Sequence, residues 1–263
     1  MNNKKGSLFL STIVIFLVFW TTGSNVFAEE EAATNADPYE GFNRAMFTFN
    51  EKIDKFILKP VATFYNTIMP RPLNQGIHNF FLNIGNLPNI ANDLLQFNFY
   101  QAANDSWRLV INTTVGVGGL FDIAERMNLK PYQNDFGLTL ARWGYKNSNY
   151  LVLPFFGPNT LRDGIGIPVD YYAFSIYPYI NPPSTRYELY GLGVVDRRAQ
   201  LLQFQDVLEV AAVDKYVFVR NAYMQRRVYQ IEQNAHRGYA DQLKSTSSNF
   251  SNTDNAEETK TAE

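Results

Sequence analysis

The chain has 263 residues, no cysteine and nearly balanced charge, with 23 Lys and Arg against 25 Asp and Glu. The missing cysteines exclude disulfides and thiol chemistry, and the small negative charge gives no reason to expect a nucleic-acid partner. The 21 Phe, 16 Tyr and 3 Trp exceed what a water-soluble core of this size usually needs, so a membrane surface is a candidate solvent.

The first segment matches a secretory signal. Lys4 and Lys5 precede the apolar run Leu8–Trp20, and small residues then lead to Ala28. Because this run is shorter than the roughly 17–25 residues of a spanning helix, we expect cleavage after Ala28, and a retained anchor is the alternative. Residues 1–28 are therefore predicted to be a signal peptide, and residues 29–36 a short acidic linker.

The next segment predicts a long amphipathic helix from Pro38 to Lys59, which Pro60 is expected to end. Five apolar residues recur on one stripe of this helix: Phe42, Met46, Phe49, Ile53 and Phe56. Periodicity does not distinguish a core-facing helix from one that lies on a membrane, so both interpretations stay open.

Further helices are predicted along the chain. Apolar residues step at helical intervals over Ile77–Phe99, where Pro88 is expected to split the segment in two. Another helix is expected over Asn104–Thr114. Helical patterning returns at Tyr187 and continues to about residue 238, with a break near residue 214, and its basic faces suit either water or anionic lipid headgroups. Residues 241–263 are predicted to be a disordered tail.

The middle of the chain is different, because Leu151–Pro183 contains six prolines and three glycines that argue against any long helix. The same segment is rich in aromatic residues. An irregular segment of this kind must bury its rings in protein or place them among lipid headgroups.

The usual catalytic and metal-binding patterns are missing. His78 and His236 lie far apart in sequence and no cysteine accompanies them, so no zinc site is expected. There is no nucleophile elbow and no phosphate-binding loop. Asp163 and Asp170 are a possible acid pair, but neighbouring turn residues and Arg162 favour structural hydrogen bonds. No catalytic site, metal site or cofactor is predicted.

Four blocks of residues resemble the signatures of a known family. They are Asp37–Arg44 with Phe47, Asn50 and Asp54; Asn112–Gly119 with Asp122 and Ala124; Asp135–Leu140 with Trp143–Gly144, Tyr150–Pro154 and Phe156–Asp163; and Val195–Ala199. Together they resemble the MlaA/VacJ family over Asp37–Tyr229, in an order and spacing that a chance motif would not produce.

The resemblance implies a mainly α fold, namely a single ring-like helical domain over residues 37–240 with amphipathic membrane-embedded helices and an irregular segment rich in Pro, Gly and aromatic residues. It implies non-enzymatic phospholipid transport at the periplasmic face of the outer membrane of a Gram-negative bacterium. Misplaced outer-leaflet phospholipid would pass through an amphipathic channel toward a soluble periplasmic lipid-carrier protein. This transport would maintain the lipid asymmetry of the outer membrane. An outer-membrane porin trimer is the implied membrane partner.

Two departures from the family pattern matter. Family members usually carry a lipidated cysteine at the mature N-terminus, so anchoring here is expected to rest on helices, the porin or an uncleaved signal. Asn159 stands where serine is usual. The alternatives to transport are an exported lipid or surface-polymer hydrolase and a purely structural outer-membrane scaffold.

A lipid channel needs an apolar wall for acyl chains and a polar wall for the headgroup. The candidates for both walls come from one segment: Leu153, Phe155, Phe156, Asn159, Thr160, Leu161, Arg162 and Ile165. Arg162 either binds phosphate oxygens or pairs with a nearby carboxylate to hold a turn. Gly164 and Gly166 are the hinge candidates, and alanine at both is expected to change transport without unfolding the protein.

Overall fold

The computed structural model describes residues 37–205 and 214–235; the predicted signal peptide, linker and tail lie outside these residues. The described residues are mainly helical, which confirms the predicted fold class, and residues 215–235 form one helix. The other elements are α2 (Glu40–Ile53), the π-helical turn η1 (Asp54–Leu58), α3 (Lys59–Ile68), α4 (Arg71–Leu95), α5 (Phe99–Thr114), α6 (Ile123–Arg126), α7 (Phe136–Arg142), β1 (Tyr150–Leu153), β2 (Gly157–Thr160), α8 (Leu161–Val169), the π-helical turn η2 (Asp170–Phe174), the 3-10 turn η3 (Tyr177–Tyr179), α9 (Pro183–Leu201) and the 3-10 turn η4 (Leu202–Phe204).

The first helix runs past Pro60, so the predicted end at Lys59 is wrong. α2, η1 and α3 follow one another without a break. The amide of Lys59 donates to the carbonyl of Asp54 across the π turn. This wider turn gives room to the proline ring, which in a regular α-helix meets the carbonyl four residues earlier.

α4 is one helix of 25 residues, so the split predicted at Pro88 is also wrong. Side chains on both sides of the proline hold the helix in place. Asn86 Nδ2 donates to the carbonyl of Asp105 at 3.0 Å, and Asn92 Nδ2 donates to Asp170 Oδ1 at 2.7 Å. Tertiary contacts thus offset the cost of about 3 kcal/mol that a proline brings to a helix interior.

The later helices are present, but two begin earlier than predicted. α5 starts at Phe99, because Asn98 caps it with its side chain. α9 starts at Pro183, since proline is well suited to the first turn of a helix. Asp214 Oδ1 accepts a backbone amide at 3.2 Å and so caps the helix over residues 215–235.

The segment Leu151–Asp170 is more regular than predicted. β1 and β2 form an antiparallel hairpin, and α8, a helix of nine residues, follows at once, so this part of the segment is not irregular. Thr160 Oγ1 caps α8 by accepting the amide of Asp163 at 3.1 Å. Pro168 lies next to the last residue of α8, just before the wider π turn η2.

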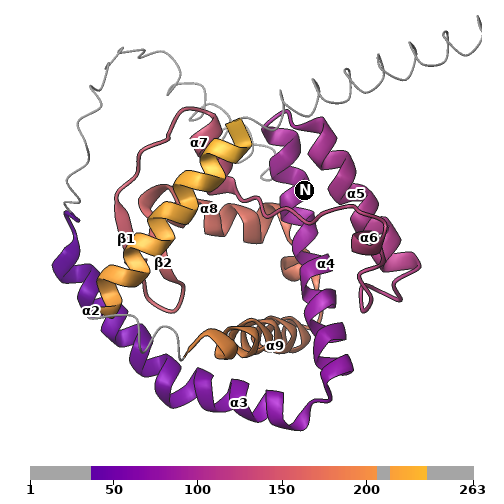
Figure 1. Ribbon diagram of the computed structural model, residues 1–263, viewed down its shortest axis with the longest axis horizontal. Helices are drawn as coiled ribbons and strands as arrows, with labels where there is room; N and C mark the ends of the chain where they lie inside the picture. The colour runs from indigo at the N-terminus through magenta and orange to yellow at the C-terminus, as the bar shows by residue number, and fades with distance from the viewer. Residues whose placement is uncertain (1–36, 206–213, 236–263) are drawn as a thin grey trace, which may run out of the picture. The chain divides into compact units, whose positions relative to one another are not determined.

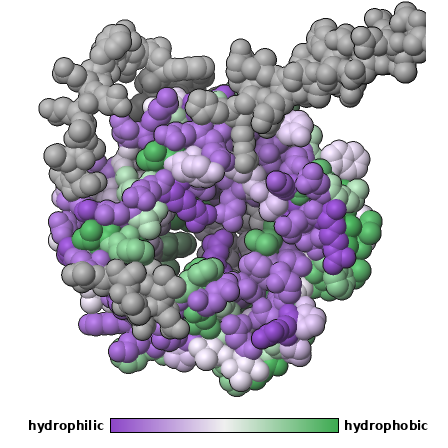
Figure 2. Space-filling model, in the orientation of Figure 1, coloured by the Kyte–Doolittle hydropathy of each residue, from purple (hydrophilic) through white to green (hydrophobic). Residues whose placement is uncertain are grey.

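The described elements pack in a closed circuit. α2 packs on the β1–β2 hairpin, the hairpin on α8, α8 on α7, α7 on α4, α4 on α9, and α9 on α3, which continues from α2. Figure 1 shows this circuit, with α5 outside α4. The same face is hollowed near its centre in Figure 2. The predicted ring-like arrangement is therefore confirmed.

The distribution of side chains is inverted relative to a water-soluble domain. Many of the most deeply buried side chains are polar or charged, including Arg162, Asp105 and Asp196. Phe56 and Phe97, by contrast, are 72% and 77% exposed. In the part of the chain that the structure describes, no helix combines the length and apolar character needed to cross a bilayer.

The apolar stripe of the first helix divides between two environments. Phe42, Phe49 and Phe56 are exposed, whereas Met46 packs against a small buried cluster that contains Tyr150. α2 buries only Asn43 completely. The core-facing interpretation therefore applies to one edge of the stripe, and the rest of it faces outward.

Candidate functional site

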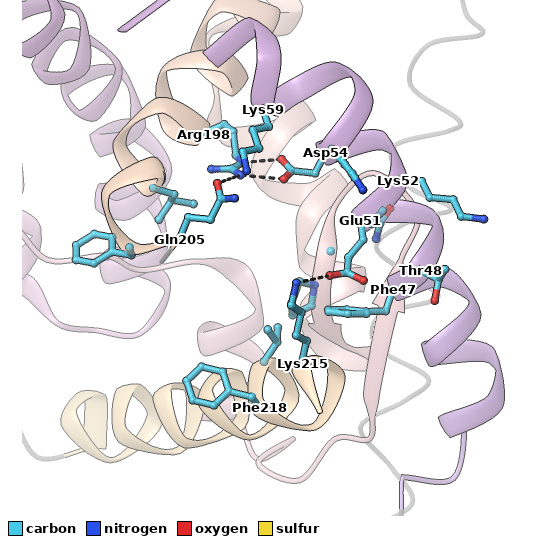
Figure 3. A pocket seen from close by; sticks show the side chains of 17 residues that line it. Phe47, Thr48, Glu51, Lys52, Asp54, Lys59, Arg198, Gln205, Lys215 and Phe218 are labelled. Atoms are coloured by element: carbon cyan, nitrogen blue, oxygen red, sulfur yellow. Dashed lines mark hydrogen bonds and ion pairs between the residues drawn. The ribbon is translucent and has the colours of Figure 1, made fainter. Parts of the chain in front are cut away.

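A cavity of about 760 Å³ opens between α2, the end of α9 with η4, the β1–β2 turn and the start of the helix over residues 215–235. Its apolar lining includes Phe47, Leu201, Phe204, Phe218 and Val219. Figure 3 shows Phe47 and Phe218 on opposite elements beside the open space. An apolar wall of this kind suits acyl chains better than a small polar substrate.

Seven charged side chains also line the cavity, five of them basic and two acidic. Arg198 Nε and Nη2 donate to Asp54 Oδ1 and Oδ2 at 2.5 and 2.8 Å. Lys215 Nζ lies 3.8 Å from Glu51 Oε1, a longer contact. Both ion pairs appear in Figure 3 and join elements that are distant in sequence.

The helix over residues 215–235, which supplies one wall of the cavity, is held by a buried ionic network. The Arg227 guanidinium donates to both oxygens of Asp135 at 2.7 and 2.9 Å, and to Asp163 Oδ1 at 2.6 Å. Tyr223 Oη donates to Asp163 Oδ2 at 2.7 Å. Arg162 Nε donates to Asp163 Oδ1 at 2.9 Å. These contacts tie the helix to α7 and α8.

Burial by itself would raise the pKa of Asp163. The charge and hydrogen bond of Arg227, together with Tyr223 and Arg162, outweigh burial and hold this pKa below its usual value. Asp163 is therefore an ionised carboxylate that accepts hydrogen bonds on both oxygens, which agrees with the structural role that the sequence favours.

The comparison with known families decides the identity of the chain. The model of the family described as "MlaA lipoprotein" matches residues 35–230. This chain belongs to the MlaA lipoprotein family. The resemblance of the four sequence blocks is thereby confirmed.

Relatives that carry the name MlaA are 30–36% identical to this chain. The intermembrane phospholipid transport system lipoprotein MlaA of Escherichia coli K12 is 36% identical over 200 residues, which cover 73% of this chain and 76% of the relative. The protein of the same name from Haemophilus influenzae is 30% identical over 206 residues, covering 77% and 82%. The region shared with these MlaA proteins includes most of the described helices.

A solved structure supports the fold. A chain from work on the "structural basis for maintenance of bacterial outer membrane lipid asymmetry" matches with a TM-score of 0.65 and 33% identity. The match covers 74% of this chain and 99% of the solved one. The likeness thus extends over nearly the whole of that MlaA-like structure.

The eight channel candidates do not act as one surface. Phe155, Phe156 and Ile165 are 73%, 55% and 56% exposed, and the Phe155 ring meets the Phe49 ring edge-on at 5.3 Å. The amide of Phe155 also donates to Asn50 Oδ1 at 2.8 Å, which ties the hairpin turn to α2. These three residues are exposed and stay candidates for contact with lipid.

The polar candidates are engaged inside the protein. Arg162 is 1% exposed and donates to Asp163 and to two backbone carbonyls. Thr160 caps α8, and Asn159 is buried with its amide on the carbonyl of Gly157. This geometry favours the interpretation of Arg162 as a residue that holds a turn, and its contact with phosphate stays a prediction. Leu153 and Leu161 are partly buried beside them.

None of the eight candidates lines the cavity, whose lining from this segment is Gly157 and Pro158. Lys59, Lys215 and Phe218 line the cavity but are not among the site residues predicted from the sequence. A signal was present, since the lysines at positions 52, 55 and 59 recur at helical spacing next to the apolar stripe. What no sequence pattern indicated is that this stripe meets the end of α9 and the helix over residues 215–235.

Asp170 also has a perturbed carboxyl, and it accepts hydrogen bonds from Asn92 and from the amide of Phe136, as the structural role predicted for it requires. Burial, aided by the negative charge of Asp135, raises the pKa of Asp170 to about 6, against the opposing effect of those hydrogen bonds. An acid whose pKa is higher in the folded state binds its proton more tightly there. Its contribution to stability is therefore complete below about pH 4 and is lost as the pH rises to about 6.

The unchanged protein should lose free energy of unfolding through Asp170 as the pH rises from about 4.5 to about 7, whereas the variant Asp170→Asn lacks this titration. We therefore expect the free energy of unfolding of the variant, relative to that of the unchanged protein, to be higher at pH 7 than at pH 4.5 by about 1–2 kcal/mol. Urea unfolding at the two pH values measures the difference. Asp163→Asn is the control, because the pKa of Asp163 lies below that range. Equal pH dependence in both variants would contradict the assignment.

Proposed function

We propose that this protein transports phospholipid at the outer membrane of a Gram-negative bacterium and catalyses no reaction. The observation that carries the proposal is the inverted distribution of side chains: buried polar networks within a closed circuit of helices, and phenylalanines exposed on its surface. A domain that stood in water would gain by burying those rings, at roughly 1.5–3 kcal/mol each. In a bilayer the exposed rings contact acyl chains instead of water, so they carry no such cost.

The cavity supplies the two kinds of wall that a phospholipid requires. Phe204 and Phe218 offer apolar surface to acyl chains, and Lys59 and Lys215 offer charge to a phosphate. A charged phosphate placed in hydrocarbon without such partners would cost far more than a single kcal/mol. The names of the relatives include phospholipid transport, and a cavity with both apolar and charged walls can perform that activity.

The outer surface supplies the contacts for membrane and partners. Phe56 and Phe64 on the η1–α3 side, and Phe99 and Trp107 on α5, are more than half exposed. We expect these surfaces to lie in the periplasmic leaflet and against an outer-membrane porin trimer. A soluble periplasmic lipid-carrier protein would accept the transported lipid, because a two-tailed lipid does not cross water unaided.

Purification of the full-length protein from membranes, followed by mass spectrometry of bound lipid, tests the proposal. We expect intact phospholipid on the protein, and transfer of labelled outer-leaflet lipid from vesicles. Release of fatty acid or headgroup that Asp163→Asn or Asp170→Asn abolishes would instead support a hydrolase. A protein that binds a porin and carries no lipid would support the scaffold alternative.

A further inference from the structure

Basic residues outnumber acidic residues in the lining of the cavity, and lipid transport by itself does not require this excess. Its five basic residues are Lys52, Lys55, Lys59, Arg198 and Lys215, and its two acids are Glu51 and Asp54. Each acid already contacts a cation, Glu51 with Lys215 and Asp54 with Arg198. Among the residues that the structure describes, no ion pair joins Lys52, Lys55 or Lys59 to a carboxylate.

The basic residues of the cavity differ in exposure, since Lys59 is partly buried and Lys215 is exposed. Lys59 is half-buried and begins α3, next to the exposed Phe56 of η1. In Figure 3 Arg198 lies beside Lys59, and Lys215 lies beside Glu51. Cations and apolar residues therefore line the same cavity, so a headgroup can contact the cations while its acyl chains contact Phe204 and Phe218.

The acids argue against a zwitterionic headgroup. A phosphoethanolamine group brings an ammonium that needs a carboxylate or another acceptor. Asp54 is held on both oxygens by Arg198, and Glu51 is the only other acidic residue of the described lining. An ammonium would therefore find Glu51 as its acidic partner among five basic residues of the described lining, and like charges at short range repel.

We infer that this cavity selects anionic phospholipids, those whose phosphodiester charge is not balanced by an ammonium, through Lys59 and Lys215. The inference rests on the proposed lipid transport and names the lipid class that it favours. The unpaired cation of Lys59 and the long contact of Lys215 leave both ammonium groups able to donate to phosphate oxygens.

The test uses the full-length protein in detergent, incubated with micelles that contain equal amounts of phosphatidylglycerol and phosphatidylethanolamine. Bound lipid is measured by mass spectrometry after re-isolation. We expect the unchanged protein to enrich phosphatidylglycerol, and the double variant Lys59→Gln, Lys215→Gln to lose that preference by about tenfold, which corresponds to about 1.4 kcal/mol.

The matched control is Lys130→Gln, Lys146→Gln, which removes the same charge from two exposed lysines outside the cavity lining. It should keep the preference, and thermal unfolding by circular dichroism checks that both double variants fold. A preference that survives in the Lys59 and Lys215 variant, or falls equally in the control, overturns the inference.

Two further outcomes identify other failures. Equal uptake of both lipids by the unchanged protein overturns the selectivity and leaves the proposed transport standing, whereas no uptake of either lipid overturns both. Inorganic phosphate added as a competitor distinguishes the source of the anion. Displacement of phosphatidylglycerol by millimolar phosphate would mean a free-phosphate site and would contradict lipid selection.

Discussion

Replacing Arg227 with methionine is expected to destabilise the folded protein by about 3–5 kcal/mol, the largest effect that we expect from a single substitution. The Arg227 side chain is 8% exposed and its guanidinium neutralises Asp135 and Asp163 together. Without it, Asp163 stays buried with only Arg162 as a cation. Urea unfolding followed by far-ultraviolet circular dichroism measures the loss.

The neighbouring residue offers a matched control. Arg226 Nη2 donates to Gln133 Oε1 at 2.6 Å in an exposed contact. Arg226→Met removes the same charge from the same helix and should change the free energy of unfolding by less than about 0.5 kcal/mol. Equal losses in the two variants would show that the buried network does not hold this helix.

Alanine at Gly166 is expected to cost about 3 kcal/mol, because α8 and α7 approach each other too closely for a methyl group. A Cβ atom at Gly166 would lie 2.8 Å from the backbone nitrogen of Gly137. Backbone atoms cannot move aside as a flexible side chain can, so the helices must separate. This expectation replaces the hinge prediction at Gly166, which required a folded and merely stiffer variant.

Gly164 is the control for Gly166 on the same helix. A Cβ there would meet only the Leu153 Cδ1 atom at 3.3 Å, which a side-chain adjustment can relieve. Gly164→Ala should therefore be neutral, or stabilising by up to about 1 kcal/mol through the higher helix propensity of alanine. Thermal unfolding of both variants measures the contrast. A stable Gly166→Ala variant would restore the hinge interpretation, and a Gly164→Ala variant with altered lipid transfer would support a hinge at that residue.

Part of the fold could be predicted because local periodicity is a property of the sequence itself. The helical character of residues 38–59, 104–114 and the region after 187 follows from apolar spacing and capping residues, and the structure has helices in each place. The prolines misled the prediction, because Pro60 and Pro168 adjoin π turns that widen the helix and Pro88 is offset by contacts from α5 and η2.

The function of individual residues depended on tertiary contacts that no local pattern contains. Arg162 and Ile165 are three positions apart in α8, yet Arg162 is buried against the carbonyls of residues 145 and 146, whereas Ile165 is exposed. The sequence alone determined the family, the helical class and an excess of aromatic residues that calls for an apolar solvent. Only the closed circuit of helices decided that Lys59 and Lys215 share one cavity, since burial and charge pairing depend on neighbours that lie far along the chain.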